Sequence, residues 1–319
     1  MWIKLFKGKR VLIVERKFSM CIAALSGTLT EKYGFLNALD KVKEWGADGV
    51  DFDLNDYNLF QYPDSIYTKS EQEFVAYFEN IRKEVEKRGL KVFQTHGTMR
   101  TFRENEEEYN TVTFPKNAEY DLRATKILGA TVCVFHPGSD LSNPTSTPEE
   151  MRFRARRAFK MILPFAKENG VKIALETVGS NWTLGNKMDF FGGYDEFRAL
   201  FDDVKNSELG EWFVCCIDTG HINLTGQHNQ PTPADFIRRM GEHVYCLHLH
   251  DNNGIVDQHR ILCGGTIDWE DVFKALKEIG YDNNFNSEVT LKYIHEDVVE
   301  ETAIITLKTM RSFVKRFID

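Results

Sequence analysis

The strongest constraint on the fold of this chain is a repeated alternation of two hydrophobic patterns. Short runs rich in β-branched and aromatic residues are each followed by a longer amphipathic helical pattern, and the alternation occurs eight times. Strands and helices in alternation indicate parallel strands joined by crossover helices. We expect strands at residues 20–26, 49–54, 91–96, 131–136, 171–177, 213–218, 244–250 and 284–291.

Eight such units close naturally into an α/β fold, the (β/α)8 TIM barrel, for which a length of about 250 residues or more is ordinary. No linker divides the chain, so we expect one barrel domain over residues 19–319 and a short N-terminal extension at 1–18. One helix is expected at 30–46, and the polar loop at 180–195 is long enough to act as a lid. A doubly wound open sheet is the alternative, but no glycine-rich phosphate loop follows an early strand.

The composition limits which binding partners and which cellular compartment are expected. The net charge of −8 at pH 7 argues against a broad nucleic-acid footprint, which relies on clustered Lys and Arg, and favours small neutral or weakly charged ligands. The apolar runs of residues 1–18 are short and broken by charge, so neither a signal peptide nor a membrane span is predicted. Several cysteines lie within apolar runs, namely Cys133, Cys215, Cys216 and Cys246. This placement indicates reduced thiols packed in the interior of a cytoplasmic protein.

Ionisable side chains collect at the ends of the expected strands. In a TIM barrel the active site is built at the carboxyl ends of the strands. The residues at or just past these ends are His96, His136, Glu176, Asp218, His221, His248, His250 and Glu288. Side chains two apart in a strand share a face, so Asp218 follows Cys216, and His248 follows Cys246, on the inward side. One histidine at a strand end is most often structural, but six of the nine histidines meet at this rim when His259 of the following loop is included. Crowded carboxylates and imidazoles satisfy one another best around a divalent cation.

Several segments carry a family resemblance: VFHPGSD, ALET, CIDTGH, HLHDNNGIVDQHRILCGGTIDW and the late SEV. Over nearly the whole chain they resemble the xylose isomerase-like TIM barrels, a superfamily that contains sugar isomerases, sugar epimerases and endonuclease IV. The resemblance implies one Mn²⁺, Mg²⁺ or Co²⁺ bound by Glu176, Asp218, His248 and Glu288.

The same resemblance implies a metal-dependent isomerase or epimerase of a sugar or sugar phosphate. Glu176 and Glu288 would remove and return a proton next to the carbonyl, through an enediolate, while His221 and His250 hold substrate hydroxyls. Barrels of this group often pair, so a homo-oligomer is also expected.

An alternative function follows from the same superfamily, because endonuclease IV holds three zinc ions. Its nine ligand positions are matched by His96, His136, Glu176, Asp218, His221, His248, Asp257, His259 and Glu288. The match would imply zinc-dependent phosphodiester hydrolysis at abasic sites in DNA. However, many sugar isomerases also keep Asp-x-His before a G-x-G-x-IDW-like segment. Here that segment reads CGGTIDW, with Cys263 and Gly264 where the commoner form has Gly and a polar or acidic residue.

Overall fold

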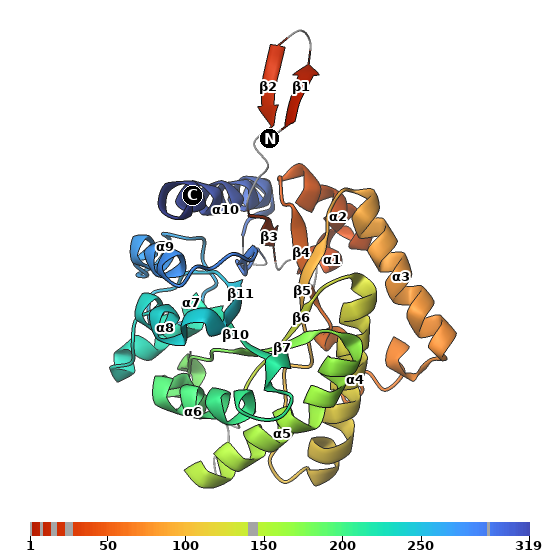
Figure 1. Ribbon diagram of the computed structural model, residues 1–319, viewed down its shortest axis with the longest axis vertical. Coiled ribbons are helices and arrows are strands. Elements are labelled where there is room, and N and C mark those ends of the chain that lie inside the picture. The colour runs from red at the N-terminus through yellow and green to blue at the C-terminus, as the bar shows by residue number, and fades with distance from the viewer. Residues whose placement is uncertain (1, 7–8, 14–17, 23–27, 140–145, 292–293) are drawn as a thin grey trace.

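The computed structural model describes residues 2–6, 9–13, 18–22, 28–139, 146–291 and 294–319, and within them it confirms the TIM barrel. Its strands are β3 (Met20–Ile22), β4 (Gly49–Asp53), β5 (Val92–His96), β6 (Val132–Phe135), β7 (Lys172–Glu176), β10 (Phe213–Asp218), β11 (Val244–His248) and β12 (Phe285–Ser287). All eight are parallel, in the order β11-β10-β7-β6-β5-β4-β3-β12. Leu249 N donates to Asn286 O at 2.9 Å and Glu288 N donates to Leu249 O at 3.1 Å, so the two outer strands meet and nearly close the ring (Figure 1).

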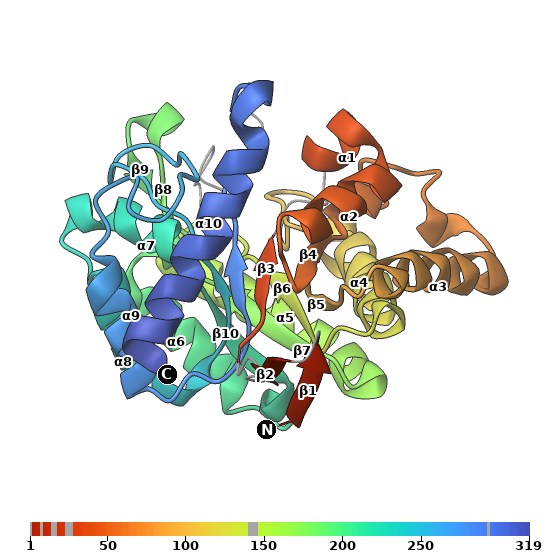
Figure 2. The same ribbon diagram turned by 90° about the horizontal axis from the view of Figure 1, so that it is seen from above.

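Helices connect the strands and surround them (Figure 2). They are α1 (Thr28–Tyr33), α2 (Phe35–Glu44), α3 (Glu71–Lys87), α4 (Phe114–Leu128), α5 (Pro148–Asn169), α6 (Tyr194–Lys205), α7 (Thr219–Thr225), α8 (Pro233–Met240), α9 (Trp269–Glu278) and α10 (Val299–Phe313). Two of the helices begin at reciprocal capping boxes in the sequence. Ser70 and Glu73 form the box at α3, and Thr147 and Glu150 form the box at α5. The prediction of a single helix at 30–46 is wrong, because the structure has two helices there. Gly34 adopts a φ of 74°, which ends α1 before α2 begins.

The strand alternation separates two apolar clusters. Side chains on one face of each strand, such as Phe135, Ile173 and Leu247, join the large core between the barrel and its helices. A separate small cluster fills the barrel interior: Val132, Val134, Ala174, Val214, Cys216 and Cys246. Asp218 and His248 continue the two inward-facing rows of the last two cysteines, so both ionisable side chains lie at the end of the interior cluster, as the period-2 pattern predicts.

The chain contains two smaller sheets besides the barrel. The antiparallel strands β1 (Trp2–Phe6) and β2 (Lys9–Ile13) pair with each other at the N-terminal end, in the segment expected as an extension (Figure 1). The proposed lid segment carries a two-stranded ribbon of β8 (Ser180–Asn181) and β9 (Lys187–Met188). Residues 23–26 of the first expected strand, including Ser26, lie outside the described residues.

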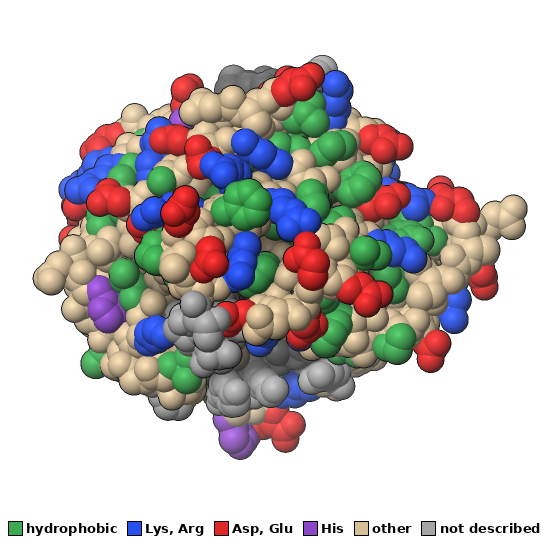
Figure 3. Space-filling model, turned by 90° about the horizontal axis from the view of Figure 1, so that it is seen from below, with side chains coloured by type: hydrophobic (Ala, Val, Ile, Leu, Met, Phe, Trp, Pro, Cys, Tyr) green, Lys and Arg blue, Asp and Glu red, His purple; other side chains and the backbone are tan. Residues whose placement is uncertain are grey.

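The surface mixes both signs of charge. Figure 3 shows acidic and basic side chains interspersed on one face of the molecule, with hydrophobic side chains between them. The six cysteines are all free, and only Cys263 is exposed. Within the described part of the chain, no helix is long and apolar enough to cross a membrane.

Candidate metal centre

Four residues from four neighbouring strand ends converge at the rim of the barrel. Each offers one ligand atom, and these atoms lie within 4.8 Å of one another: Glu176, Asp218, His248 and Glu288. Glu176, Asp218 and His248 are the last residues of β7, β10 and β11, and Glu288 follows β12 directly. His248 Nδ1 lies 3.0 Å from Glu176 Oε1 and 3.6 Å from Glu288 Oε2. Glu176, Asp218 and His248 are buried, whereas the Glu288 side chain is 25% exposed, so three of the four ligands lie beneath the surface and the fourth lies at its edge.

Further groups of potential ligands flank this set. On one side, His96 Nε2 and His136 Nε2 each lie 3.1 Å from Glu176 Oε2. On the other side, Asp257 Oδ2 lies 3.5 Å from His221 Nε2 and 3.2 Å from His259 Nε2. A third group consists of His250, His259 and Glu288, which shares Glu288 with the central set. The structure therefore brings all ten residues selected from the sequence into one continuous cluster.

Local structure explains how two of these histidines are placed. Asp218 caps the N-terminus of α7 by accepting the backbone N–H of His221 at 2.6 Å, which brings His221 back beside the strand end. His250 Nε2 lies 3.0 Å from Asp218 Oδ1. A side chain at Gly220 would place its Cβ 2.0 Å from His250 Cε1, so only glycine allows this approach.

The loop after β11 positions Asp257 and His259. Asp251 is fully buried and accepts hydrogen bonds from Trp269 Nε1 at 2.8 Å and from Asn252 N at 2.9 Å.

At the start of the CGGTIDW segment, Cys263 has a φ of 67°, in the left-handed region that favours glycine. The departure from the commoner family pattern at this position is therefore accommodated by a less favourable backbone conformation.

The cluster is strongly coupled electrostatically. Burial would raise the pKa of Glu176, but the facing charges of His248 and His136 outweigh it and hold this pKa well below its usual value. Burial would lower the pKa of His248, but Glu288 and Glu176 raise it well above the usual value. For Glu288, burial prevails over His248 and His259, so its pKa is raised.

The donor set fits a divalent cation. Within the described residues, Glu288 Oε2 and Asp257 Oδ1 are buried and have no hydrogen-bond partner. Burying a polar atom unpaired is costly, and carboxylate oxygens with imidazole nitrogens are suitable ligands for Mn²⁺, Mg²⁺, Co²⁺ or Zn²⁺. A cation bound by the central set would remove this cost for Glu288. One bound by the group of His221, Asp257 and His259 would remove it for Asp257. The residues present therefore fit the metal that the sequence predicts.

A cavity of about 440 Å³ opens beside the cluster, and His136, His221 and Asp257 form part of its wall. The opposite wall comes from the segment between β7 and α6, and includes Asp189. This buried carboxylate accepts hydrogen bonds from Phe191 N at 2.8 Å and from the Ser139 hydroxyl. The sequence does not single out Asp189, because this residue lies in an irregular loop, where no periodic pattern assigns a face.

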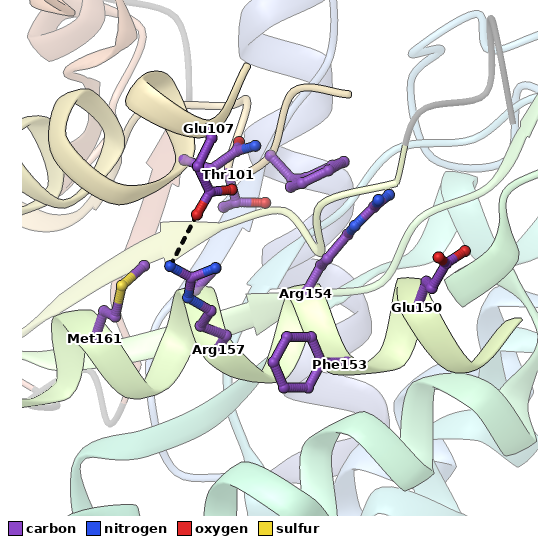
Figure 4. A pocket seen from close by; sticks show the side chains of 10 residues that line it. Thr101, Glu107, Glu150, Phe153, Arg154, Arg157 and Met161 are labelled. Atoms are coloured by element: carbon purple, nitrogen blue, oxygen red, sulfur yellow. Dashed lines mark hydrogen bonds and ion pairs between the residues drawn. The ribbon is translucent and has the colours of Figure 1, made fainter. Parts of the chain in front are cut away.

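A second cavity, of about 290 Å³, lies between α5 and the segment after β5 (Figure 4). Arg157 of α5 bonds Glu107 at 3.1 Å across it, and Thr101 at its wall donates to the carbonyl of His136 at 3.0 Å. The hydrogen bond from Thr101 therefore connects the wall of this cavity to the loop that carries His136.

A TIM barrel with carboxylates and imidazoles gathered at the carboxyl ends of its strands defines a class of barrel enzymes with a polar, metal-compatible rim. This chain belongs to the xylose isomerase-like TIM barrel family, whose profile matches residues 39–306.

Two curated proteins are similar to parts of this chain. MJ1311 of Methanocaldococcus jannaschii is 30% identical over 159 residues, which are 49% of this chain and 49% of MJ1311. The protein y4fM of Sinorhizobium fredii matches over 39% of its length, so the chain spans about half or less of these curated relatives.

Solved structures with the same fold cover nearly the whole chain. A D-tagatose 3-epimerase-like protein has a TM-score of 0.68 and 19% identity, over 93% of this chain and 97% of its own. A D-psicose 3-epimerase solved in the presence of D-fructose has a TM-score of 0.68 and 16% identity, over 93% and 99%. The IOLI protein, solved with a bound zinc atom, has a TM-score of 0.65 and 16% identity, over 94% and 98%. At these identities the likeness is one of fold.

Proposed function

We propose that this protein is a metal-dependent sugar isomerase or epimerase that moves a proton at the carbon next to a carbonyl. The observation that carries the proposal is the convergence of Glu176, Asp218, His248 and Glu288 within 4.8 Å, in a barrel of the xylose isomerase-like family. The epimerases among its structural relatives support the same reaction class.

The two glutamates have different surroundings. Both oxygens of Glu176 are engaged, Oε1 by His248 at 3.0 Å and Oε2 by His96 at 3.1 Å, whereas Glu288 Oε2 has no hydrogen-bond partner among the described residues. Glu288 is therefore the carboxylate better placed to exchange a proton with substrate, and Glu176 would serve as its counterpart on the opposite side of the reacting carbon. A bound divalent cation would polarise the carbonyl and lower the pKa of the adjacent C–H.

The cavity wall favours a neutral, hydroxylated substrate. Among the described residues that line it there is neither lysine nor arginine, and its carboxylates are Asp189 and Asp257. Its two imidazoles, His136 and His221, already face Glu176 and Asp257. Carboxylates accept hydrogen bonds from hydroxyl groups and repel phosphate. We therefore favour a free sugar over a sugar phosphate.

The proposal is tested by proton exchange. Protein loaded with Mn²⁺ is incubated with a panel of free ketoses in D₂O, and NMR is expected to show deuterium at the carbon next to the carbonyl. Glu176→Gln is expected to abolish the exchange, because the amide can neither accept the proton nor retain the ligand charge. Glu44→Gln, at an exposed position of α2, is the matched control and should exchange at the wild-type rate. Absence of exchange with every ketose, or full exchange by Glu176→Gln, would contradict the proposal.

A second candidate function is zinc-dependent hydrolysis of phosphodiester bonds at abasic sites. One observation favours it: two further ligand groups flank the central set. The first consists of His96, His136 and Glu176, and the second consists of His221, Asp257 and His259. The net charge of −8 weighs against a DNA substrate. Elemental analysis separates the two: about one cation per chain supports the isomerase, whereas about three Zn²⁺ and cleavage of an abasic-site duplex would favour the nuclease.

A further inference from the structure

A buried carboxylate lies directly behind the central ligand set. Asp51 of β4 is 4% exposed, and its Oδ2 lies 3.1 Å from His248 Nε2. The same oxygen accepts hydrogen bonds from Gln94 Nε2 of β5 at 2.8 Å and from Asn286 Nδ2 of β12 at 3.0 Å. Asp51 and Gln94 are direct partners in the β4–β5 register, so the barrel itself holds this carboxylate in place.

The two nitrogens of the His248 ring face different partners. Nε2 faces Asp51, and Nδ1 faces the ligand set, 3.0 Å from Glu176 Oε1 and 3.6 Å from Glu288 Oε2. An ionised carboxylate only accepts hydrogen bonds, so it stabilises the ring form that carries its proton on Nε2. In a metal-bound centre, where Nδ1 gives up its own proton to the solvent, the lone pair of Nδ1 would be directed toward Glu176 and Glu288, where the cation would lie.

We propose that Asp51 is a positioning residue that holds the proton of His248 on Nε2 and thereby makes Nδ1 the metal-ligand atom. Gln94 and Asn286 hold Asp51 in turn, so the support spans β4, β5 and β12. Carboxylates that orient a metal-binding histidine in this way commonly contribute 10- to 100-fold to metal affinity. The inference rests on the metal centre of the proposed function, but it does not depend on which sugar is the substrate.

The test compares metal affinity and the protonated ring nitrogen in wild-type protein and Asp51→Asn. The amide offers both a donor and an acceptor at nearly the same volume, so the form with the proton on Nε2 loses its advantage. We expect Mn²⁺ binding, measured by chelator competition, to weaken about 10- to 100-fold. In the Zn²⁺-loaded wild type, ¹⁵N NMR of the histidine rings is expected to show His248 protonated at Nε2 and altered at Nδ1 by the metal.

Two variants control for folding. Asp271→Asn removes another hydrogen-bonded carboxylate, which accepts from Arg238 Nη2 at 2.6 Å and joins α9 to α8, and should leave Mn²⁺ affinity unchanged. Gln94→Ala withdraws one donor from Asp51 while keeping the carboxylate, and should weaken binding less than Asp51→Asn does. If Asp51→Asn fails to fold, Gln94→Ala and the wild-type NMR measurement still decide the question.

The outcomes separate the inference from the proposed function. Wild-type Mn²⁺ affinity in Asp51→Asn, or a His248 ring in the Zn²⁺-loaded wild type that keeps its proton on Nδ1 and binds the metal through Nε2, would overturn the role of Asp51 and leave the isomerase proposal standing. A wild-type protein that binds metal with the expected dependence on Asp51, but exchanges no ketose proton, would overturn the isomerase proposal alone.

Discussion

At the scale of single residues, the candidate site consists of side chains that hold one another. His259 illustrates this: its Nδ1 lies 2.8 Å from the carbonyl oxygen of Glu288, its Nε2 lies 3.2 Å from Asp257 Oδ2, and its ring stacks on His250 at 3.8 Å. It belongs to two of the potential ligand groups but not to the central set. This residue is therefore the one whose removal best distinguishes a single-metal from a three-metal site.

His259→Ala is expected to weaken substrate binding without loss of the main cation, because the four central ligands remain. Elemental analysis should then report an unchanged metal content, and ketose-exchange kinetics should show a raised KM. His295→Ala, at an exposed position before α10, is the control. Loss of one ion per chain together with activity would instead support the three-metal site, and full activity with full metal content would contradict both roles of His259.

At the scale of elements, a buried carboxylate connects α4 to the segment that follows β5. Asp121 of α4 accepts hydrogen bonds from Tyr67 OH at 2.6 Å, from Thr98 N at 2.8 Å and from Thr98 Oγ1 at 2.9 Å. Thr98 is two residues past His96, so this contact fixes the path of the chain just after a potential ligand. Burial raises the pKa of Asp121 to about 7, despite the hydrogen bonds from Tyr67 and Thr98 that lower it.

The raised pKa of Asp121 predicts a pH-dependent stability. Between about pH 4 and the folded-state pKa of about 7, the folded protein binds this proton more tightly than the unfolded chain does, so stability falls as pH rises through this window. Asp121→Asn lacks the titration. The free energy of unfolding of wild type relative to Asp121→Asn is therefore expected to fall by about 2 kcal/mol from pH 5 to pH 8, measured by urea denaturation. A difference that does not vary with pH would show that Asp121 does not titrate in this range.

At the scale of the whole molecule, the central ligands come from parts of the chain that only the closed barrel brings together. Glu176 on β7 and Glu288 after β12 are separated in sequence by the barrel strands β10 and β11 and by the ribbon of β8 and β9. Without a cation, facing imidazoles lower the pKa of Glu176, whereas burial keeps the pKa of Glu288 raised. A cation that binds all four ligands would therefore stabilise the folded barrel as a unit.

Metal binding is accordingly expected to raise the melting temperature. A ligand present at 100 times its Kd stabilises the folded state by about 2.7 kcal/mol, which should shift Tm by several degrees. Differential scanning fluorimetry of chelator-treated protein, with and without Mn²⁺, measures the shift. Glu176→Gln should lose most of it, and equal shifts in the two proteins would place the stabilising cation elsewhere.

The sequence by itself determined the barrel and most of the candidate site. Hydrophobic periodicity predicted all eight strands, and strand alternation predicted that Asp218 and His248 follow the interior residues Cys216 and Cys246. These predictions succeed because strand geometry alone decides which side chains share a face. The cytoplasmic location, the homo-oligomer and the division at residue 18 stay predictions.

Contacts that depend on how the strands form the ring and on the paths of the loops were decided only by the tertiary structure. Asp51 lies in the expected strand at 49–54, where no local pattern assigns it a partner, yet it contacts His248, 197 positions later, because the register of the barrel places them together. Asp189 reaches the cavity through an irregular loop, and Gly34 divides the expected helix at 30–46. Local patterns specify faces and periods, whereas distances between remote strands and loops follow from how the whole chain packs.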